Sequence, residues 1–256
     1  MIVKTQTPAY LDYRLPFETR VGDLVSRMTL EEKAGQLLYN APAIPRLGIP
    51  EYNWWNEALH GVARAGYATV FPQSITIANS WDEELLSDVA TAISDEARAK
   101  YHESVRRGER GIYHGLTFWS PNINIFRDPR WGRGHETYGE DPCLTGRLGM
   151  RFVKGMQGSD TRYLKTVSTA KHFAVHSGPE PLRHKFNAIV SERDLRETYL
   201  PAFRTLVKEG GVYSVMGAYN MFRGHPACAS DELYGILRNE WGFGGYIVSD
   251  CWAVSD

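Results

Sequence analysis

The second half of the chain alternates between short apolar runs and amphipathic segments, and this alternation constrains the fold more than any other feature. The spacing predicts strands at residues 117–119, 123–126, 166–170, 212–218 and 246–249, and helices at 141–156, 191–207 and 230–241. Strands that alternate with helices form parallel sheets with right-handed crossover connections. The sequence therefore predicts an α/β fold for this half of the chain.

The first half carries helix signals separated by less regular stretches. Residues 1–16 show no periodic pattern, and a helix is predicted at 16–28. Thr29 and Glu32 form a capping-box signature that opens a second helix through residue 38. Asp82 is predicted to cap a long helix that runs to about residue 102. Residues 44–52 hold two prolines and a glycine and predict a loop, with a short strand within it as an alternative.

Composition and charge exclude several classes of protein. The 256 residues are enough for one sizeable domain or most of a barrel. A net charge of −1 gives no electrostatic reason to expect nucleic acid or an anionic membrane as a partner. The three cysteines are odd in number and widely spaced, so they predict neither a disulfide framework nor a zinc motif. No dinucleotide-binding glycine motif is present, and no cofactor is predicted.

The sequence carries no targeting or membrane signal. No run approaches the roughly 18 apolar residues that a membrane helix needs. Residues 1–8 lack the apolar segment of a signal peptide. A cytoplasmic location is one interpretation, and the compartment stays open.

Polar side chains recur where apolar runs end. They are Arg133, the pair Lys171 and His172, the pair Tyr219 and Asn220, and Asp250. In a (β/α) barrel, the chemistry is carried by the carboxyl ends of the strands. Four polar clusters on one face are difficult to attribute to helix capping alone, so the predicted fold is a TIM-type (β/α) barrel with its active site at this face.

Each cluster also has an ordinary structural interpretation. Asp250 is either a nucleophile or base, or the N-cap of a following helix. Glu57 could be an ordinary helix residue, and Arg133 a solvated charge. Lys171 could form a salt bridge, with His172 as a structural histidine. His172 and His176 could be imagined as metal ligands, but no accompanying ligand motif supports a metal site.

Taken as a set, these stretches resemble the N-terminal barrel of glycoside hydrolase family 3. The resemblance spans residues 52–250 in the expected order. The matching stretches are 52–61 (YNWWNEALHG), 127–133 (RDPRWGR) with Glu136 and 140–142 (EDP), 171–173 (KHF), 216–220 (MGAYN) and 249–250 (SD).

The resemblance implies a retaining exo-glycosidase without a metal or cofactor, acting on an oligosaccharide. Asp250 would be its nucleophile. The implied ligands of the terminal sugar are Glu57, Arg133, Lys171, His172, Arg183 and Tyr219. Retaining hydrolysis also needs a second carboxyl group as acid and base.

Two stretches resemble the β-xylosidase branch of the family, namely 54–61 and 249–251 (SDC). β-Glucosidases of the family more often carry Asp where Glu57 stands. The longer side chain would crowd the C6 hydroxymethyl group of a hexose, which xylose lacks. The implied reaction is removal of β-linked xylose from the non-reducing ends of xylo-oligosaccharides. A β-glucosidase, an α-L-arabinofuranosidase and a non-catalytic sugar-binding fragment remain alternatives.

The N-acetylglucosaminidase branch of the family is disfavoured by residues 174–179. That branch carries Pro-Gly-His-Gly after Lys-His-Phe, whereas this chain has AVHSGP.

The acid/base residue is expected to lie outside this chain. In the family it usually comes from a domain that follows the barrel, whereas this sequence ends six residues after Asp250. Residues 1–256 are therefore predicted to be a truncated barrel domain, incomplete at its C-terminus and lacking the C-terminal α/β sandwich domain. A downstream domain or a second chain would have to supply the acid/base residue.

Overall fold

The computed structural model describes residues 7–254, which fall into two compact units divided between Asn53 and Trp54. The sequence predicted one barrel domain over residues 1–256, and all the parallel strands of the observed barrel sheet lie in the second unit. Residues 1–6 lie outside the described residues. They include most of the stretch 1–8, which lacks a signal-peptide pattern, and the start of the irregular stretch 1–16. Within residues 7–254, no helix combines the length and the apolar character that a membrane crossing requires.

The first unit contains two short helices and a two-stranded antiparallel sheet. Helix α1 spans Phe17–Arg27, as predicted. Helix α2 spans Leu30–Gly35 and begins with the predicted capping box, in which the Thr29 hydroxyl accepts from the Glu32 amide and the Glu32 carboxylate accepts from the Thr29 amide. Strands β1 (Asn40–Ala41) and β2 (Tyr52–Asn53) are too short to be recognised by periodicity.

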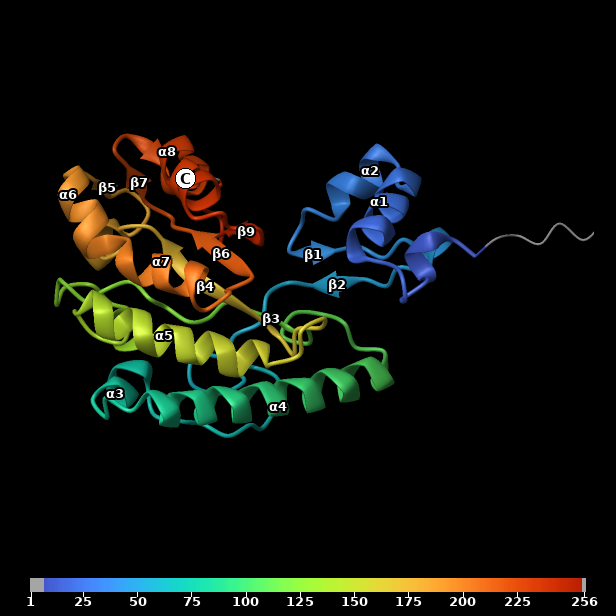
Figure 1. The fold of residues 1–256 in the computed structure, drawn as a ribbon, viewed down its shortest axis with the longest axis horizontal. Coiled ribbons are helices and arrows are strands. Elements are labelled where there is room, and N and C mark those ends of the chain that lie inside the picture. The colour runs from blue at the N-terminus through green and yellow to red at the C-terminus, as the bar shows by residue number, and fades with distance from the viewer. Residues whose placement is uncertain (1–6, 255–256) are drawn as a thin grey trace, which may run out of the picture. The chain divides into compact units, whose positions relative to one another are not determined.

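The second unit is built on four parallel strands that lie next to one another in chain order (Figure 1). They are β3 (Thr117–Phe118), β4 (Val167–Phe173), β6 (Ser214–Gly217) and β9 (Tyr246–Ser249). Chain-order pairing of parallel strands with helices between them is the arrangement of a TIM-type (β/α) barrel, so the predicted fold class is confirmed. The described residues contain four of the eight strands that a closed barrel has.

One predicted strand does not form. Residues 123–126 hold no strand, and the neighbouring Asn122 makes only an isolated bridge to Lys171. The Ile123 amide donates to the Lys171 carbonyl at 2.9 Å. Beyond this point the Asn124 side chain, rather than the backbone, bonds to the next peptide of β4.

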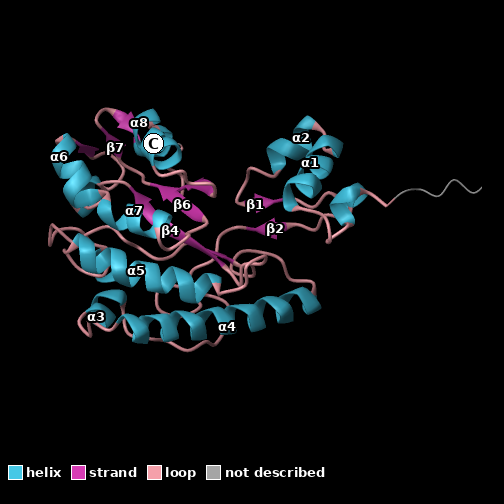
Figure 2. Cartoon of the chain, viewed as in Figure 1, coloured by secondary structure: helices cyan, strands magenta, loops and turns pink. Residues whose placement is uncertain are grey.

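The helices follow the predicted caps. Asp82 accepts from two amides at the start of α4 (Glu83–Arg107), and Asp141 does so from one at the start of α5 (Pro142–Gln157). The short helix α3 (Ser74–Ala78) precedes α4. Figure 2 distinguishes these helices from the strands of the sheet.

Two predicted helices are interrupted. The segment predicted at 191–207 consists of α6 (Glu192–Asp194), a π-helical turn (Leu195–Tyr199) and α7 (Pro201–Lys208). Pro201 has no N–H to donate, which accounts for the break in the hydrogen-bond pattern before it. The segment predicted at 230–241 consists of α8 (Asp231–Gly235) followed by a π-helical turn (Ile236–Glu240).

A small three-stranded sheet lies beside the barrel strands and was not predicted. It consists of β5 (Asn187–Ala188), β7 (Met221–Phe222) and β8 (His225–Pro226). Each strand has two residues, too few to show an alternating pattern.

Helix α5 is the centre of the helical layer and contacts both α4 and α7. Figure 1 shows α4 and α5 running side by side. The α5 side chains Leu148 and Phe152 are fully buried, and the Phe173 ring from β4 packs edge-on against Phe203 of α7 at 5.0 Å. At Gly155 the helices α4 and α5 come so close that an added Cβ would lie 2.6 Å from the Cβ of Ala90.

This close approach predicts opposite effects for two glycine substitutions. Gly155→Ala should destabilise the fold by about 1–3 kcal/mol, because the added methyl group forces the two helices apart. Gly235→Ala is the matched control: a Cβ added to Gly235 in α8 would meet no atom within 4 Å apart from its chain neighbours and the backbone of its own helix, so we expect no loss and a gain of up to about 1 kcal/mol. Urea unfolding of the two variants measures this difference. Equal changes in both would show that α4 and α5 separate without cost.

Candidate active site

The polar clusters predicted at the strand ends come together around one cavity. It has a volume of about 520 Å³ and lies at the carboxyl ends of β4, β6 and β9. Six of the predicted site residues line it: Glu57, Arg133, Lys171, Arg183, Tyr219 and Asp250. The seventh, His172, is only 1% exposed and lies behind the lining, where it contacts Arg133 and Asp250.

Asp250 is held by the pairing of β9 with β6. Its amide donates to the Gly217 carbonyl at 3.0 Å, which continues the parallel ladder by one residue. Its Oδ1 accepts from the Cys251 amide at 2.8 Å. Its Oδ2 is buried and makes no hydrogen bond of ordinary geometry within residues 7–254.

The helix-cap interpretation of Asp250 is not supported by this geometry. An N-cap side chain accepts from an amide two or three residues further on, whereas Asp250 accepts from the next residue. Residues 251–254 form a turn. The Tyr219 hydroxyl and the His172 ring lie near this carboxylate. A carboxylate so placed at a cavity wall can act as a nucleophile or a base.

The protonation of Asp250 is set by two opposing effects. Burial raises the pKa of its carboxyl group above the usual value, while the positive charges of Lys171 and Arg133 lower it. The net shift is upward. The same burial, with the negative charge of Asp250, raises the pKa of the Tyr219 hydroxyl, which therefore stays protonated and able to donate.

Arg133 is fixed on three sides. Its Nε and Nη2 donate to the two oxygens of Glu136 at 2.8 and 2.7 Å, and its Nη1 lies 2.9 Å from Nε2 of His172. Both side chains of the ion pair are 14% exposed. Burial alone would raise the pKa of Glu136, but the hydrogen bonds and charge of Arg133 outweigh it and hold this pKa at about 2.

Glu57 lies in a loop, so its interpretation as an ordinary helix residue is wrong. Its Oε1 accepts from the Trp55 indole N–H at 3.0 Å, and its Oε2 lies 4.0 Å from the Lys171 ammonium group. The Trp55 ring stacks on Trp119, with 4.9 Å between ring centroids. The tryptophan pair thus orients the carboxylate toward Lys171.

Arg183 and Tyr219 complete the lining from two different segments. Arg183 follows the short helical turn Glu180–Leu182 and donates to Glu180, and its side chain is 29% exposed. Tyr219 follows β6, and its ring lies 4.3 Å from that of His184. Neither side chain belongs to a strand.

Two buried asparagines of the site were missed in the sequence. Asn122 donates weakly to Glu136 at 3.4 Å, and Asn124 contacts His172. Asn124 lies in the stretch interpreted as a strand and Asn122 directly precedes it, so that the two alternate with Ile123 and Ile125. Two asparagines at every second position of an apolar run were the signal that could have found them.

Three carboxylates line the cavity: Glu57, Glu136 and Asp250. A general acid must carry a proton near neutral pH. Glu136, with a pKa of about 2, is ionised there and cannot act as the acid. The arrangement therefore provides a nucleophile or base, several hydrogen-bond donors suited to hydroxyl groups, and a carboxylate that holds an arginine in place.

Comparison with known proteins agrees with this geometry. The model of the glycosyl hydrolase family 3 N terminal domain matches residues 39–256. The fold and site define a family 3 glycoside hydrolase barrel, and the chain belongs to this family.

Its curated relatives include a xylan 1,4-beta-xylosidase of Xylanibacter ruminicola, 52% identical over 98% of this chain and 30% of the relative. A beta-xylosidase/alpha-L-arabinofuranosidase of Medicago sativa is 43% identical over 97% of this chain and 34% of its own length. The chain thus spans about a third of the length of these relatives.

Solved structures give the same result. A GH3 exo-beta-xylosidase in complex with a xylobiose aziridine probe superposes with a TM-score of 0.88 at 35% identity, over 97% of this chain and 33% of that one. A beta-glucosidase from Streptomyces venezuelae in complex with D-glucose gives 0.77 at 32% identity, over 91% and 29%.

The buried Arg133–Glu136 pair predicts a specific pH dependence of stability. The folded pKa of Glu136 lies below its ordinary value of 4.5, so its ionisation stabilises the fold above pH 4.5 and this contribution is lost as the pH falls toward 2. Glu136→Gln should therefore cost on the order of 2 kcal/mol at pH 7, and the difference from the unmodified chain should shrink between pH 5 and 2.

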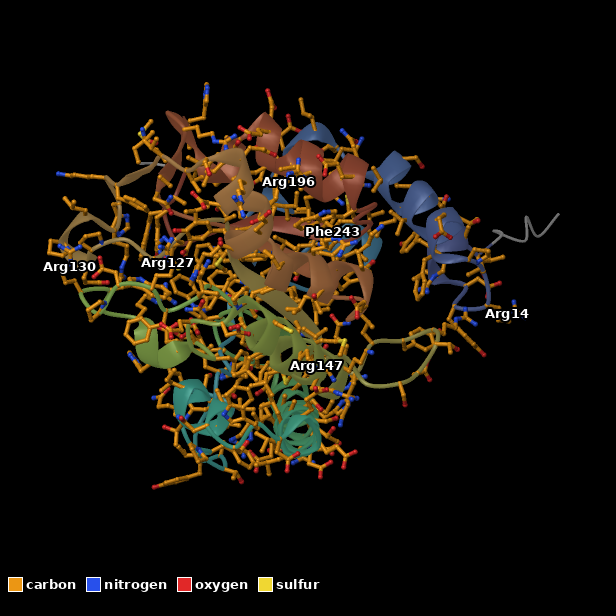
Figure 3. The ribbon with its side chains drawn as sticks, turned by 60° about the vertical axis from the view of Figure 1, so that its left-hand side comes forward. Arg14, Arg127, Arg130, Arg147, Arg196 and Phe243 are labelled. Carbon is orange, nitrogen blue, oxygen red and sulfur yellow. The ribbon has the colours of Figure 1, made fainter. Side chains whose placement is uncertain are left out.

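Asp128→Asn is the matched control for this prediction. Asp128 also has a pKa of about 2, but it pairs with Arg130, whose side chain is 74% exposed and lies at the periphery of the molecule (Figure 3). Water screens such a pair, so we expect almost no change. Urea unfolding from pH 7 to pH 3 makes the comparison. Equal losses for the two variants would show that burial of the Glu136 pair is irrelevant.

Proposed function

We propose that this chain provides the nucleophile and the sugar-binding site of a retaining exo-glycosidase, which removes β-linked xylose from the non-reducing ends of xylo-oligosaccharides. The observation that carries the proposal is the Asp250 carboxylate, which lies at the wall of a cavity lined by hydroxyl-binding side chains and whose Oδ2 makes no hydrogen bond of ordinary geometry within residues 7–254. Family membership and the printed activities of the relatives support the reaction class.

In the proposed first step, Oδ2 of Asp250 attacks the anomeric carbon and the glycosidic C–O bond breaks. The leaving oxygen takes a proton from a general acid, and the sugar remains bound to Asp250 as an ester. In the second step, water attacks the same carbon after losing a proton to the acid/base group, and the Asp250 carboxylate is released. The Cys251 amide, bound to Oδ1, keeps the carboxylate oriented through both steps.

The proposed sugar ligands divide by charge. Lys171, Arg133 and Arg183 would donate to hydroxyl groups, and Glu57 would accept from them. Lys171 and Arg133 also favour the anionic form of Asp250 against the effect of burial. The ring would thus be fixed in position by the same cations that keep the nucleophile charged.

The acid/base group is proposed to come from another part of the full-length protein or from a second chain. Glu136 is unsuited because Arg133 keeps it ionised. The relatives are about three times as long as this chain, which supports a contribution from another region. The competing hypothesis is a module that binds a monosaccharide without turnover. A xyloside with an acidic phenol leaving group distinguishes them, because its departure needs little protonation.

Xylose is proposed as the sugar because Glu57 extends one methylene further than the aspartate expected in β-glucosidases. β-Glucosidase and α-L-arabinofuranosidase activity remain the alternatives, since the relatives and solved structures include both names.

Covalent labelling tests the nucleophile. We expect a 2,4-dinitrophenyl 2-fluoro-β-xyloside to label the chain at Asp250, and Asp250→Asn to abolish labelling because the amide cannot form the ester. Asp128→Asn, which alters a surface carboxylate, should label normally. Peptide mass spectrometry locates the modification. A label on Glu57 or Glu136 would overturn the assignment.

Ligand-induced stabilisation tests the sugar. Xylose should raise the melting temperature more than glucose at the same concentration, because binding to the folded state stabilises it by mass action and Glu57 restricts space for C6. Glu57→Asp should reduce this preference. Equal shifts with the two sugars would remove the support for xylose.

A further inference from the structure

The side chain of Asn124 is matched to both the peptide and the ring of His172. Its Oδ1 accepts from the His172 amide at 2.7 Å and lies 3.0 Å from the ring Nδ1. Its Nδ2 donates to the His172 carbonyl at 2.9 Å. The two residues are 4% and 1% exposed, so no solvent competes for these groups.

These contacts determine which way the carboxamide faces. A backbone amide can only donate and a backbone carbonyl can only accept, so the oxygen of Asn124 must face the amide and its nitrogen the carbonyl. The oxygen is therefore also the atom beside Nδ1 of His172. An oxygen at that place requires a proton on Nδ1.

The other ring nitrogen gives the same answer independently. Arg133 Nη1 lies 2.9 Å from Nε2 of His172, and a guanidinium group can only donate. Nε2 must therefore accept, which is possible only in the neutral ring protonated at Nδ1. Burial, followed by the charge of Arg133, lowers the pKa of His172 well below its usual value.

The charged and titratable neighbours of His172 come from several segments. The cations Arg133, Lys171 and Arg183 disfavour a proton on the ring, as does His176, whose ring lies 4.8 Å away. Asp250 is the opposing group: its Oδ2 lies 3.5 Å from Nε2. With Nε2 unprotonated, this contact is neither a hydrogen bond nor an ion pair.

We propose that Asn124 is a positioning residue that holds His172 in the Nδ1-protonated neutral form, so that Nε2 accepts from Arg133 and does not donate to Oδ2 of Asp250. In the other tautomer, Nε2–H would point at Asp250 and Arg133. It would bond the oxygen proposed to attack the sugar and would remove the third contact of the guanidinium group. The role in catalysis rests on the proposed function, whereas the ring's tautomer does not.

The chain contains a matched pair for comparison. His176 Nδ1 lies 2.9 Å from Oδ1 of Asn220, whose Nδ2 donates to the Val175 and Met221 carbonyls. Asn220 thus orients His176 as Asn124 orients His172, but His176 contacts neither Arg133 nor Asp250 through a hydrogen bond among the described residues. A substitution of Asn220 therefore shows the effect of losing a similar buried side-chain amide that orients His176 instead of His172.

Long-range ¹H–¹⁵N NMR of the histidine side chains tests the tautomer directly, with the His172 signal assigned from a His172→Gln variant. At pH 7 the unmodified chain should show His172 neutral and protonated at Nδ1, with or without sugar. A signal from the Nε2-protonated form, or from imidazolium, would overturn the proposal. This measurement requires neither a variant of Asn124 nor enzymatic activity.

Asn124→Asp tests whether Asn124 determines the protonation state of His172. A carboxylate beside Nδ1 favours imidazolium, so we expect the pH titration of His172 to rise by about one unit or more. Asn220→Asp should raise that of His176 and leave His172 in its original form. An unchanged His172 in folded Asn124→Asp would refute the role of Asn124.

The rate of labelling by the 2-fluoro-xyloside tests whether the protonation state of His172 affects the reactivity of Asp250. In Asn124→Asp this rate should fall as the pH drops through the new His172 titration, with no such fall in Asn220→Asp. A folded Asn124→Asp chain that labels like the unmodified one at every pH would refute the effect on Asp250. If the unmodified chain does not label at all, the proposed function fails while the tautomer is still decided by NMR.

Discussion

The parallel pairing of β4, β6 and β9 is the constraint on which the site depends. Residues that end neighbouring parallel strands meet at one edge, which is how Lys171, Tyr219 and Asp250 line the same cavity although they are far apart in sequence. The pairing is close at its start: a Cβ on Gly245 would lie 2.1 Å from the Tyr213 carbonyl oxygen. A side chain at Gly245 would push β9 away from β6 and move Asp250 with it.

Burial at this edge makes the electrostatics of the site interdependent. Removing Arg133 from water is costly, and the two hydrogen bonds to Glu136 offset that cost, as the pKa of Glu136 near 2 shows. The same burial pushes the pKa of Asp250 upward, and the cations around it oppose the shift. Removing one of these groups would therefore alter the protonation of the others, so their substitutions should not be additive.

The barrel strands, and the cavity residues Lys171, Tyr219 and Asp250 at their ends, could be predicted from sequence because apolar runs that end in polar residues are local patterns. Glu57 and Arg183 were expected only from the resemblance to a known family. The strand Tyr246–Ser249 and the helix caps Asp82 and Asp141 are examples. What could not be predicted depends on partners distant in sequence. The two-residue strand β5 is defined only by its pairing with β7, and Asn124 looks like a strand residue until its contact with His172 is seen.

The Asn124 side chain, rather than a paired backbone, contacts β4 at His172, and residues 123–126 form no strand. It meets three polar groups of His172: the amide, the carbonyl and Nδ1. The carboxamide satisfies all three groups with one side chain. Nε, Nη1 and Nη2 of Arg133 and both ring nitrogens of His172 then have partners inside the protein. Oδ2 of Asp250 has no hydrogen bond of ordinary geometry within residues 7–254, which leaves it able to act on a ligand.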